Sequence, residues 1–142
     1  MSDHRITVLP GDGTGREVAL EAQRILDTIQ NHSNHGFEQT VIDCGGEHYL
    51  ATGEEWAEGS FELCKNETDA IFLGAIGYPG ARLPNGDLAG GSVILGLRSG
   101  LDLFANVRPI KLYDGVPHKI HGGFRQIWEP GMVDMTLLRE NT

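Results

Sequence analysis

This sequence is poor in cysteine, in basic residues and in long hydrophobic runs. Its two cysteines, Cys44 and Cys64, are not spaced as a metal-binding pair, and no apolar signal segment opens the chain, which favours reduced thiols in the cytoplasm. No apolar run reaches the roughly 20 residues that a bilayer-spanning helix needs. The formal net charge of −9 argues against nonspecific binding to nucleic acid or to an anionic membrane, because both need a basic surface.

The rest of the composition indicates a folded α/β protein. Hydrophobic residues make up 39% of the chain, enough for a packed core. Apolar runs and helical periodicities alternate, which is typical of strands layered with helices. The pattern predicts strands over residues 5–10, 37–43, 70–73, 103–112 and 133–140, and helices over 15–30, 54–66 and 93–99. Residues 74–91 are expected to form a glycine-rich loop, and residues 113–131 show little periodicity.

The first predicted helix has a clear apolar face. Its apolar residues recur at helical spacing and are expected to cover the sheet. They are Val18, Ala19, Ala22, Ile25, Leu26 and Ile29.

Two arginines, Arg98 and Arg108, stand near the ends of a segment that is otherwise suited to burial, and Arg139 follows later. A guanidinium offers a planar fork of donors that matches a carboxylate, so arginines facing one cavity would suit a polycarboxylate. Taken alone, Arg98 and Arg108 are equally compatible with surface positions or with pairing to acids such as Asp102.

Four segments in the same order resemble one family. The family is that of the β-decarboxylating dehydrogenases. Its opening strand and turn resemble residues 6–18, and a later strand with its glycine turn resembles residues 69–77. Its substrate segment resembles residues 97–109, and the strand that carries its third substrate arginine resembles residues 137–142. This family contains isopropylmalate, isocitrate, homoisocitrate, tartrate and D-malate dehydrogenases. The resemblance implies an incomplete isocitrate/isopropylmalate dehydrogenase-like α/β fold, with parallel strands alternating with helices. Residues 1–100 would form the N-terminal half of the large cofactor-side domain, and 101–142 the truncated start of the smaller substrate and dimerisation domain.

The resemblance also implies a function. The complete protein would be an oxidoreductase that acts on a substituted malate with NAD or NADP and Mg²⁺ or Mn²⁺, as a cytoplasmic homodimer. The family's catalytic tyrosine, lysine and metal-binding aspartates lie beyond Thr142, so no catalytic or metal-binding residue is assigned and the fragment alone is expected to be inactive. Sheet edges and apolar faces are expected to be left uncovered, with marginal stability. The alternative is a noncatalytic anion-binding or regulatory polypeptide derived from the family.

By the same resemblance, Arg98, Arg108 and Arg139 would bind the substrate's carboxylates, with Ser92 and Ile94 nearby. Ser92 is equally well explained as a helix N-cap. Ile94 lies one helical turn before Arg98, where it could contact the substituent of the malate, although ordinary core packing also explains it.

The glycine-rich turns would lie along the cofactor groove, which makes Thr14, Gly74 and Gly77 candidate cofactor contacts. The turn at residues 11–15 lacks the spacing of a dinucleotide fingerprint, and Asp12 would repel a phosphate. The main role expected of its glycines is therefore a tight strand-to-helix turn. His32 and His35 are close in sequence but lack a third ligand, so a solvated turn is expected rather than a metal site.

Overall fold

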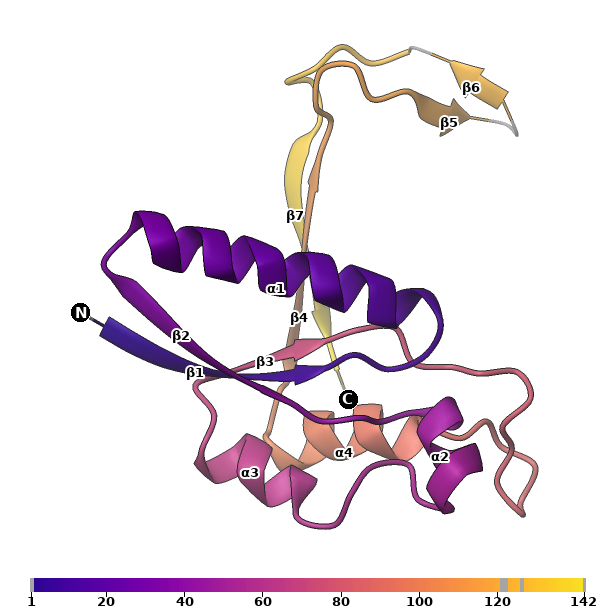
Figure 1. The fold of residues 1–142 in the computed structure, drawn as a ribbon. Helices are drawn as coiled ribbons and strands as arrows, with labels where there is room; N and C mark the ends of the chain where they lie inside the picture. The colour runs from indigo at the N-terminus through magenta and orange to yellow at the C-terminus, as the bar shows by residue number, and fades with distance from the viewer. Residues whose placement is uncertain (1, 121–122, 126, 142) are drawn as a thin grey trace. The chain divides into compact units, whose positions relative to one another are not determined.

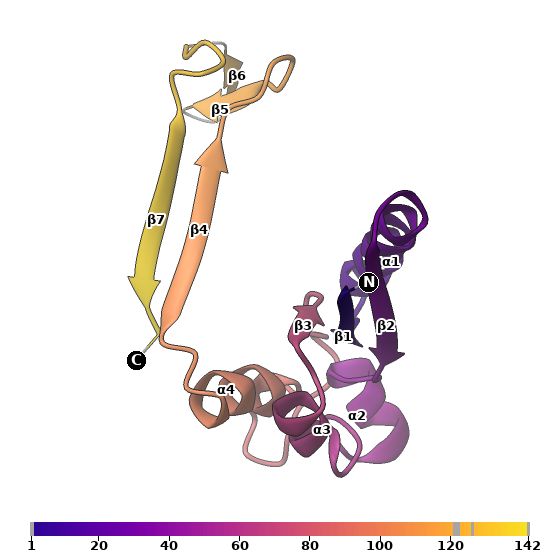
Figure 2. The same cartoon turned by 90° about the vertical axis from the view of Figure 1, so that its left-hand side faces the viewer.

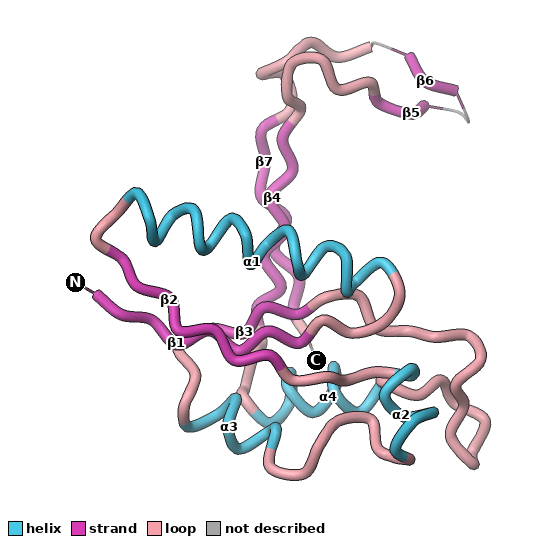
Figure 3. The backbone as a smooth tube through the Cα atoms, in the orientation of Figure 1, coloured by secondary structure: helices cyan, strands magenta, loops and turns pink. Residues whose placement is uncertain are grey.

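The structure is a computed structural model that describes residues 2–120, 123–125 and 127–141. The chain divides into two compact units, Met1–Leu101 and Asp102–Thr142. The first unit layers helices on a sheet, and the second consists of strands and loops (Figure 1, Figure 3). The roles expected of the two parts, cofactor side and substrate side, stay predictions.

A parallel three-stranded sheet organises the first unit. β1 (Ser2–Leu9) lies between β2 (His35–Val41) and β3 (Ala70–Leu73), and both pairings are parallel. The three strands predicted from the apolar runs are therefore confirmed. Val8 and Leu9 are fully buried, as a strand covered on both faces requires.

The two faces of β1 pack against different helices. Ile6 and Val8 form one cluster with Ala19 of α1 (Thr14–His32). Leu9, on the opposite face, packs with residues of the helices α3 (Ser60–Asn66) and α4 (Gly91–Gly100). Figures 1 and 2 show α1 on one side of the sheet and α3 and α4 on the other. This arrangement follows from the alternation of side chains along a strand.

Only part of the predicted apolar face of α1 is covered. Ala19 is buried and Leu26 packs on the sheet, but Val18, Ile25 and Ile29 are 60%, 61% and 42% exposed. The edge strand β3 also exposes Phe72 and Leu73. Uncovered apolar faces were expected, and they are present in the first unit.

The predicted helix over 54–66 is wrong in its first half. Helix α2 (Gly46–Thr52), which the sequence pattern did not predict, ends at Gly53 with φ 85°. The next helix, α3, begins only at Ser60, after Gly59 with φ 82°. Two glycines in the left-handed region stop one helix and start the next, because other residues adopt that conformation at a cost.

The second unit is built on an antiparallel ribbon. β4 (Ala105–Lys111) pairs with β7 (Asp134–Glu140) over their whole lengths. A short antiparallel pair, β5 (His118–Ile120) and β6 (Gly123–Arg125), lies in the segment where no regular element was expected. These strands have three residues each, too few for a periodicity to be visible in the sequence.

Candidate active site

The carboxyl ends of β1 and β3 meet at a topological switch point. From β1 the chain goes to β2 on one side, and it returns for β3 to the other side of β1. In open parallel sheets, ligands bind outside the carboxyl ends of the strands at such a point. The turn at residues 10–15 and the loop at residues 74–77 lie there, and both were singled out from the sequence.

These two segments pack backbone against backbone. The N–H of Asp12 donates to the carbonyl of Ala75 at 2.7 Å. A Cβ on Gly11 would lie 2.1 Å from that carbonyl oxygen, and one on Gly15 2.6 Å from it. Gly11 also has a φ of 72°. Close packing thus requires glycine at Gly11 and Gly15, and the positive φ of Gly11 belongs to the tight turn that the sequence predicted.

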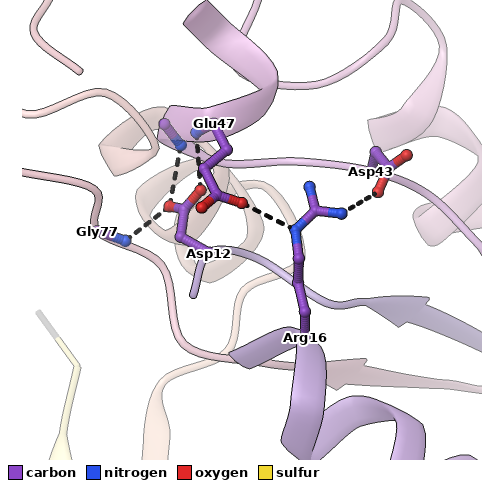
Figure 4. Close-up of polar contacts among 6 residues, drawn as sticks. Asp12, Arg16, Asp43, Glu47 and Gly77 are labelled. Atoms are coloured by element: carbon purple, nitrogen blue, oxygen red, sulfur yellow. Dashed lines mark hydrogen bonds and ion pairs between the residues drawn. The ribbon is translucent and has the colours of Figure 1, made fainter. Parts of the chain in front are cut away.

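Asp12 is the central polar group of this region (Figure 4). Its side chain is buried, and Oδ2 accepts hydrogen bonds from the N–H groups of Gly46 at 2.9 Å and Gly77 at 2.8 Å. Oδ1 accepts from the N–H of Glu47 at 2.8 Å. A buried carboxylate needs such partners, and here one carboxylate joins the β1 turn, the start of α2 and the loop after β3.

Arg16, Glu47 and Asp43 form an ion-pair cluster next to Asp12 (Figure 4). Arg16, in the first turn of α1, places Nε 3.0 Å from a carboxylate oxygen of Glu47 and Nη1 3.3 Å from one of Asp43. The guanidinium is therefore already neutralised by two carboxylates. It connects α1 to α2 and to the segment after β2, and it is not a free anion-binding group.

The three candidate cofactor residues differ in their surroundings. Thr14 and Gly77 are exposed, and a Cβ on Gly77 would meet no atom within 4 Å. Gly74 is half-buried, and a Cβ there would lie 2.0 Å from the carbonyl oxygen of Pro10. Thr14 and Gly77 therefore border open space at the switch point, whereas the absence of a side chain at Gly74 is explained by packing.

Helix α4 carries Ser92, Ile94 and Arg98. Ser92 and Arg98 are exposed and Ile94 is half-buried, with the expected helix confirmed over Gly91–Gly100. Ser92 is not the N-cap, because Gly90 occupies that position with a φ of 103°. Gly90 has no side chain that could cap the helix. A carboxylate from elsewhere does so instead. Glu55 Oε1 accepts one hydrogen bond from the N–H of Gly90 and another, at 3.4 Å, from that of Ser92.

The β4–β7 register brings Arg108 and Arg139 together. Arg139 is paired with Asn106, and Arg108 lies two residues after Asn106 on the same strand. Side chains alternate along a strand and paired residues share a face, so all three side chains belong to one face of the ribbon. Arg108 Nε donates to Asn106 Oδ1 at 3.2 Å. Asn106 was not singled out from the sequence, because only the register reveals its place.

The arginines are not neutralised within their own units. Over the described residues, Arg98 forms no ion pair inside the first unit, and Arg108 and Arg139 form none inside the second. On the opposite face of β4, Lys111 lies 3.1 Å from Asp134, and this hydrogen-bonded ion pair raises the pKa of the lysine. The face of the β4–β7 ribbon with Arg108 and Arg139 therefore carries uncompensated positive charge, whereas the charge of Lys111 is paired.

The described cysteines and histidines contribute no further reactive cluster. Both cysteines are free and buried, and burial raises the pKa of the Cys44 thiol to about 11. His32 is exposed and contacts the backbone carbonyl of Thr28. In the described part of the chain, no group of three or more His, Cys, Asp or Glu side chains is arranged to hold a metal ion. Nor does any helix within that part have the length and apolar character to cross a membrane.

Asp12 and Glu55 are the functional candidates that the sequence did not reveal. Asp12 was noted only as a charge that would oppose phosphate, and Glu55 was not singled out; it lies in the first half of the predicted 54–66 helix, which the structure does not form. Each carboxylate bonds to backbone 34 or more residues away in sequence. A local pattern carries no signal for such contacts.

Comparison with known proteins agrees with this architecture. The 3-isopropylmalate dehydrogenase of Corynebacterium glutamicum (strain R) is 38% identical over 138 residues, covering 97% of this chain and 36% of that protein. The enzyme of the same name from Thermotoga maritima is 39% identical over 115 residues, 80% of this chain and 32% of that protein. The chain thus spans about a third of the length of these relatives.

Solved structures show the same fold. A β-decarboxylating dehydrogenase of Thermococcus kodakarensis matches with a TM-score of 0.60 at 25% identity, over 96% of this chain and 41% of that one. A protein of Thermus thermophilus matches with a TM-score of 0.68 at 22% identity, over 96% and 24%. The sequence profile of the isocitrate/isopropylmalate dehydrogenases matches residues 5–142. The resemblance found in the sequence is confirmed, and this chain belongs to the isocitrate/isopropylmalate dehydrogenase family.

Proposed function

We propose that the protein oxidises and decarboxylates a substituted malate with NAD or NADP, and that Arg98, Arg108 and Arg139 bind the substrate's carboxylates. Family membership supports the reaction class. The observation that carries the residue assignment is the shared face of Arg108 and Arg139, where no described acidic side chain of the same unit neutralises them. Arg98, on α4 of the first unit, is assigned to the substrate from family membership alone.

The arginines would bind and orient the substrate. Two guanidinium groups on one ribbon face can each form charge-assisted hydrogen bonds to a carboxylate, and Asn106 restrains the Arg108 side chain through Nε. Binding both carboxylates would fix the hydroxyl-bearing carbon between them. Such orientation removes much of the entropic barrier to reaction. On α4, Ile94 would contact the apolar substituent and Ser92 would lie near the reacting groups.

The cofactor, when bound, would accept a hydride from the carbinol carbon as the hydroxyl loses its proton, which gives a β-keto acid that loses carbon dioxide. Thr14 and Gly77 fit one side of such a cofactor, since both are exposed and Gly77 borders open space. The N–H of Gly77 is already donated to Asp12 and cannot bind a phosphate as well.

A divalent metal does not fit the described residues, because they offer no cluster of ligands. We therefore assign no step of the reaction to a metal in this chain. A cytoplasmic homodimer is proposed together with the activity, from family membership alone.

The test uses the longest polypeptide that the encoding reading frame specifies. NAD(P)H formation at 340 nm is followed with isopropylmalate, isocitrate, tartrate and D-malate. Arg108→Ala and Arg139→Ala are each expected to lower kcat/KM about 10- to 150-fold, the loss of a hydrogen bond to a charged group worth about 1.5–3 kcal/mol.

Lys111→Ala is the matched control, since it removes one positive charge from the same strand but from the opposite face. It should change kcat/KM less than threefold. Equal effects of Arg108→Ala and Lys111→Ala would remove Arg108 from the site. Absence of turnover with all four substrates would reject the proposed reaction.

A further inference from the structure

We infer that Asp12 is the positioning residue of the loop at residues 74–77, and that its carboxylate holds this loop in the form that meets the cofactor. The cofactor part of this inference rests on the proposed function. Asp12 itself does not touch the reacting atoms in this assignment. It acts through the backbone of Gly77.

The contacts of Asp12 are directed at the loop and at α2 together. Oδ2 is shared between the N–H groups of Gly46 and Gly77, at 2.9 and 2.8 Å, and Oδ1 is used by Glu47. The backbone N–H of Asp12 also donates to Ala75, so one residue grips the loop through both its main chain and its side chain. The start of the loop is held by Gly74, whose N–H donates to Leu9 at 2.7 Å.

The hydrogen bond to Asp12 is the one that the structure describes for Gly77 itself, while its neighbour Ile76 packs against the core of the first unit. Gly77 is exposed, has a φ of 143°, and a Cβ on it would meet no atom within 4 Å. Side-chain packing therefore does not fix its position. The partly buried hydrogen bond to Asp12 does, and it is charge-assisted, so it is stronger than a neutral one.

The space around the carboxylate is closed to other ligands. A Cβ on Gly45 would lie 2.6 and 2.7 Å from the two carboxylate oxygens of Asp12. The N–H groups of Gly46, Glu47 and Gly77, which would otherwise attract a phosphate, are already used by Asp12. The carboxylate thus takes the place of an anionic ligand and makes the loop rigid before any cofactor binds.

The test compares Asp12→Ala with Asp12→Asn in the longest polypeptide of the reading frame. In the Asn variant the carboxamide oxygen can take the place of Oδ2 and keep the bonds from Gly46 and Gly77, while its NH₂ group faces the N–H of Glu47. We expect amide hydrogen exchange at Gly77 to be about tenfold faster or more in Asp12→Ala and only a few-fold faster in Asp12→Asn, whose bond to Gly77 is kept but is neutral. Exchange at Glu47 should be faster in both variants.

Asp69→Ala is the matched control at the opposite end of β3. Asp69 Oδ2 accepts a hydrogen bond from the N–H of Arg5 at 2.8 Å, and the N–H of Asp69 donates to the carbonyl of Arg5. Like Asp12, Asp69 therefore bonds to a neighbouring segment through both its side chain and its main chain. In the kinetic assay, Asp12→Ala should raise the KM for NAD(P) about tenfold or more, with less than a threefold change in the KM for the hydroxy acid. Asp69→Ala should leave both near the wild-type values.

Each outcome bears on the inference. Unchanged exchange at Gly77 in Asp12→Ala would overturn it, and so would a KM for NAD(P) no higher than in Asp69→Ala. If Asp12→Ala does not fold, Asp12→Asn decides: exchange at Gly77 that is about tenfold faster or more despite a folded core contradicts the assigned role of the Oδ2 position. If the wild type shows no turnover, the proposed function fails, whereas the exchange data still support or refute the grip of Asp12 on the loop. In that case, absence of NAD⁺ binding by calorimetry would overturn the cofactor part.

Discussion

Gly74 and Gly96 provide two Gly→Ala substitutions with opposite expected effects on stability. At Gly74 the new Cβ would lie 2.0 Å from the carbonyl oxygen of Pro10, 2.8 Å from its carbonyl carbon and 3.0 Å from the carbonyl oxygen of Gly15. All three atoms belong to the backbone, so relief requires the β1 turn and the loop after β3 to separate.

The cost of Gly74→Ala has two parts. Overpacking costs about 1–3 kcal/mol, and weakening the hydrogen bond from Gly74 to Leu9 costs about 0.5–1.5 kcal/mol. We expect the free energy of unfolding to fall by about 1.5–4.5 kcal/mol, the sum of the two parts. Gly96 lies inside α4, and a Cβ there meets no atom within 4 Å, so Gly96→Ala should gain about 1 kcal/mol from helix propensity.

Urea unfolding of the chain measures both changes. In a Trp128→Phe background, fluorescence reports on Trp56, which packs against the core of the first unit. With an m-value of about 1.5 kcal/mol/M, the midpoint should fall by about 1–3 M for Gly74→Ala and rise by about 0.7 M for Gly96→Ala. A midpoint of Gly74→Ala equal to or above that of the wild type would refute the packing argument. A contact with the cofactor would then be the remaining explanation for the glycine at position 74.

Three further predictions concern carboxylates and a thiol. Glu55→Ala should destabilise the first unit by about 0.5–2 kcal/mol and speed amide exchange at Gly90 and Ser92, because it removes the carboxylate that caps α4. Glu54→Ala, a substitution of the exposed neighbouring residue, is the control. Equal urea midpoints for the two variants would exclude Glu55 as the cap of α4. The backbone N–H of Arg5, with its guanidinium, lowers the pKa of Asp69, so the stabilisation by this carboxylate should be present above the ordinary Asp pKa of about 3.9 and be lost as pH falls below it. Asp69→Asn should therefore be less stable than the wild type at pH 6, by a margin that shrinks toward pH 3 in urea titrations, and a margin independent of pH would contradict this. With a pKa of about 11, Cys44 should react with iodoacetamide at pH 8 about 100-fold more slowly in the folded chain than in urea, as followed by mass spectrometry; comparable rates would show that the thiol is neither buried nor shifted.

The strands and the long helices of the first unit, the ribbon strands and the family were all predictable from the amino-acid sequence. These elements follow from local patterns: the β-branched and apolar run at Ile6 to Leu9, ended by Pro10 and Gly11, favours a buried strand, and the spacing of Ala19, Ala22 and Leu26 fits a helix. The arginine segments were recognisable because a charged group in an apolar stretch needs an anion.

The side-chain hydrogen bonds to distant backbone groups became visible only in the folded chain. Asp12 bonds to Gly77 across 65 positions, Glu55 bonds to Gly90 across 35, and the register of β4 with β7 puts Arg139 beside Asn106. Gly53 and Gly59 likewise restrict the helix expected over 54–66 to α3, and the preceding helix α2 was not predicted. Chain neighbours within one turn or one strand repeat are visible in a sequence as a period, whereas a hydrogen bond between distant segments depends on how the whole sheet is assembled and has no local pattern.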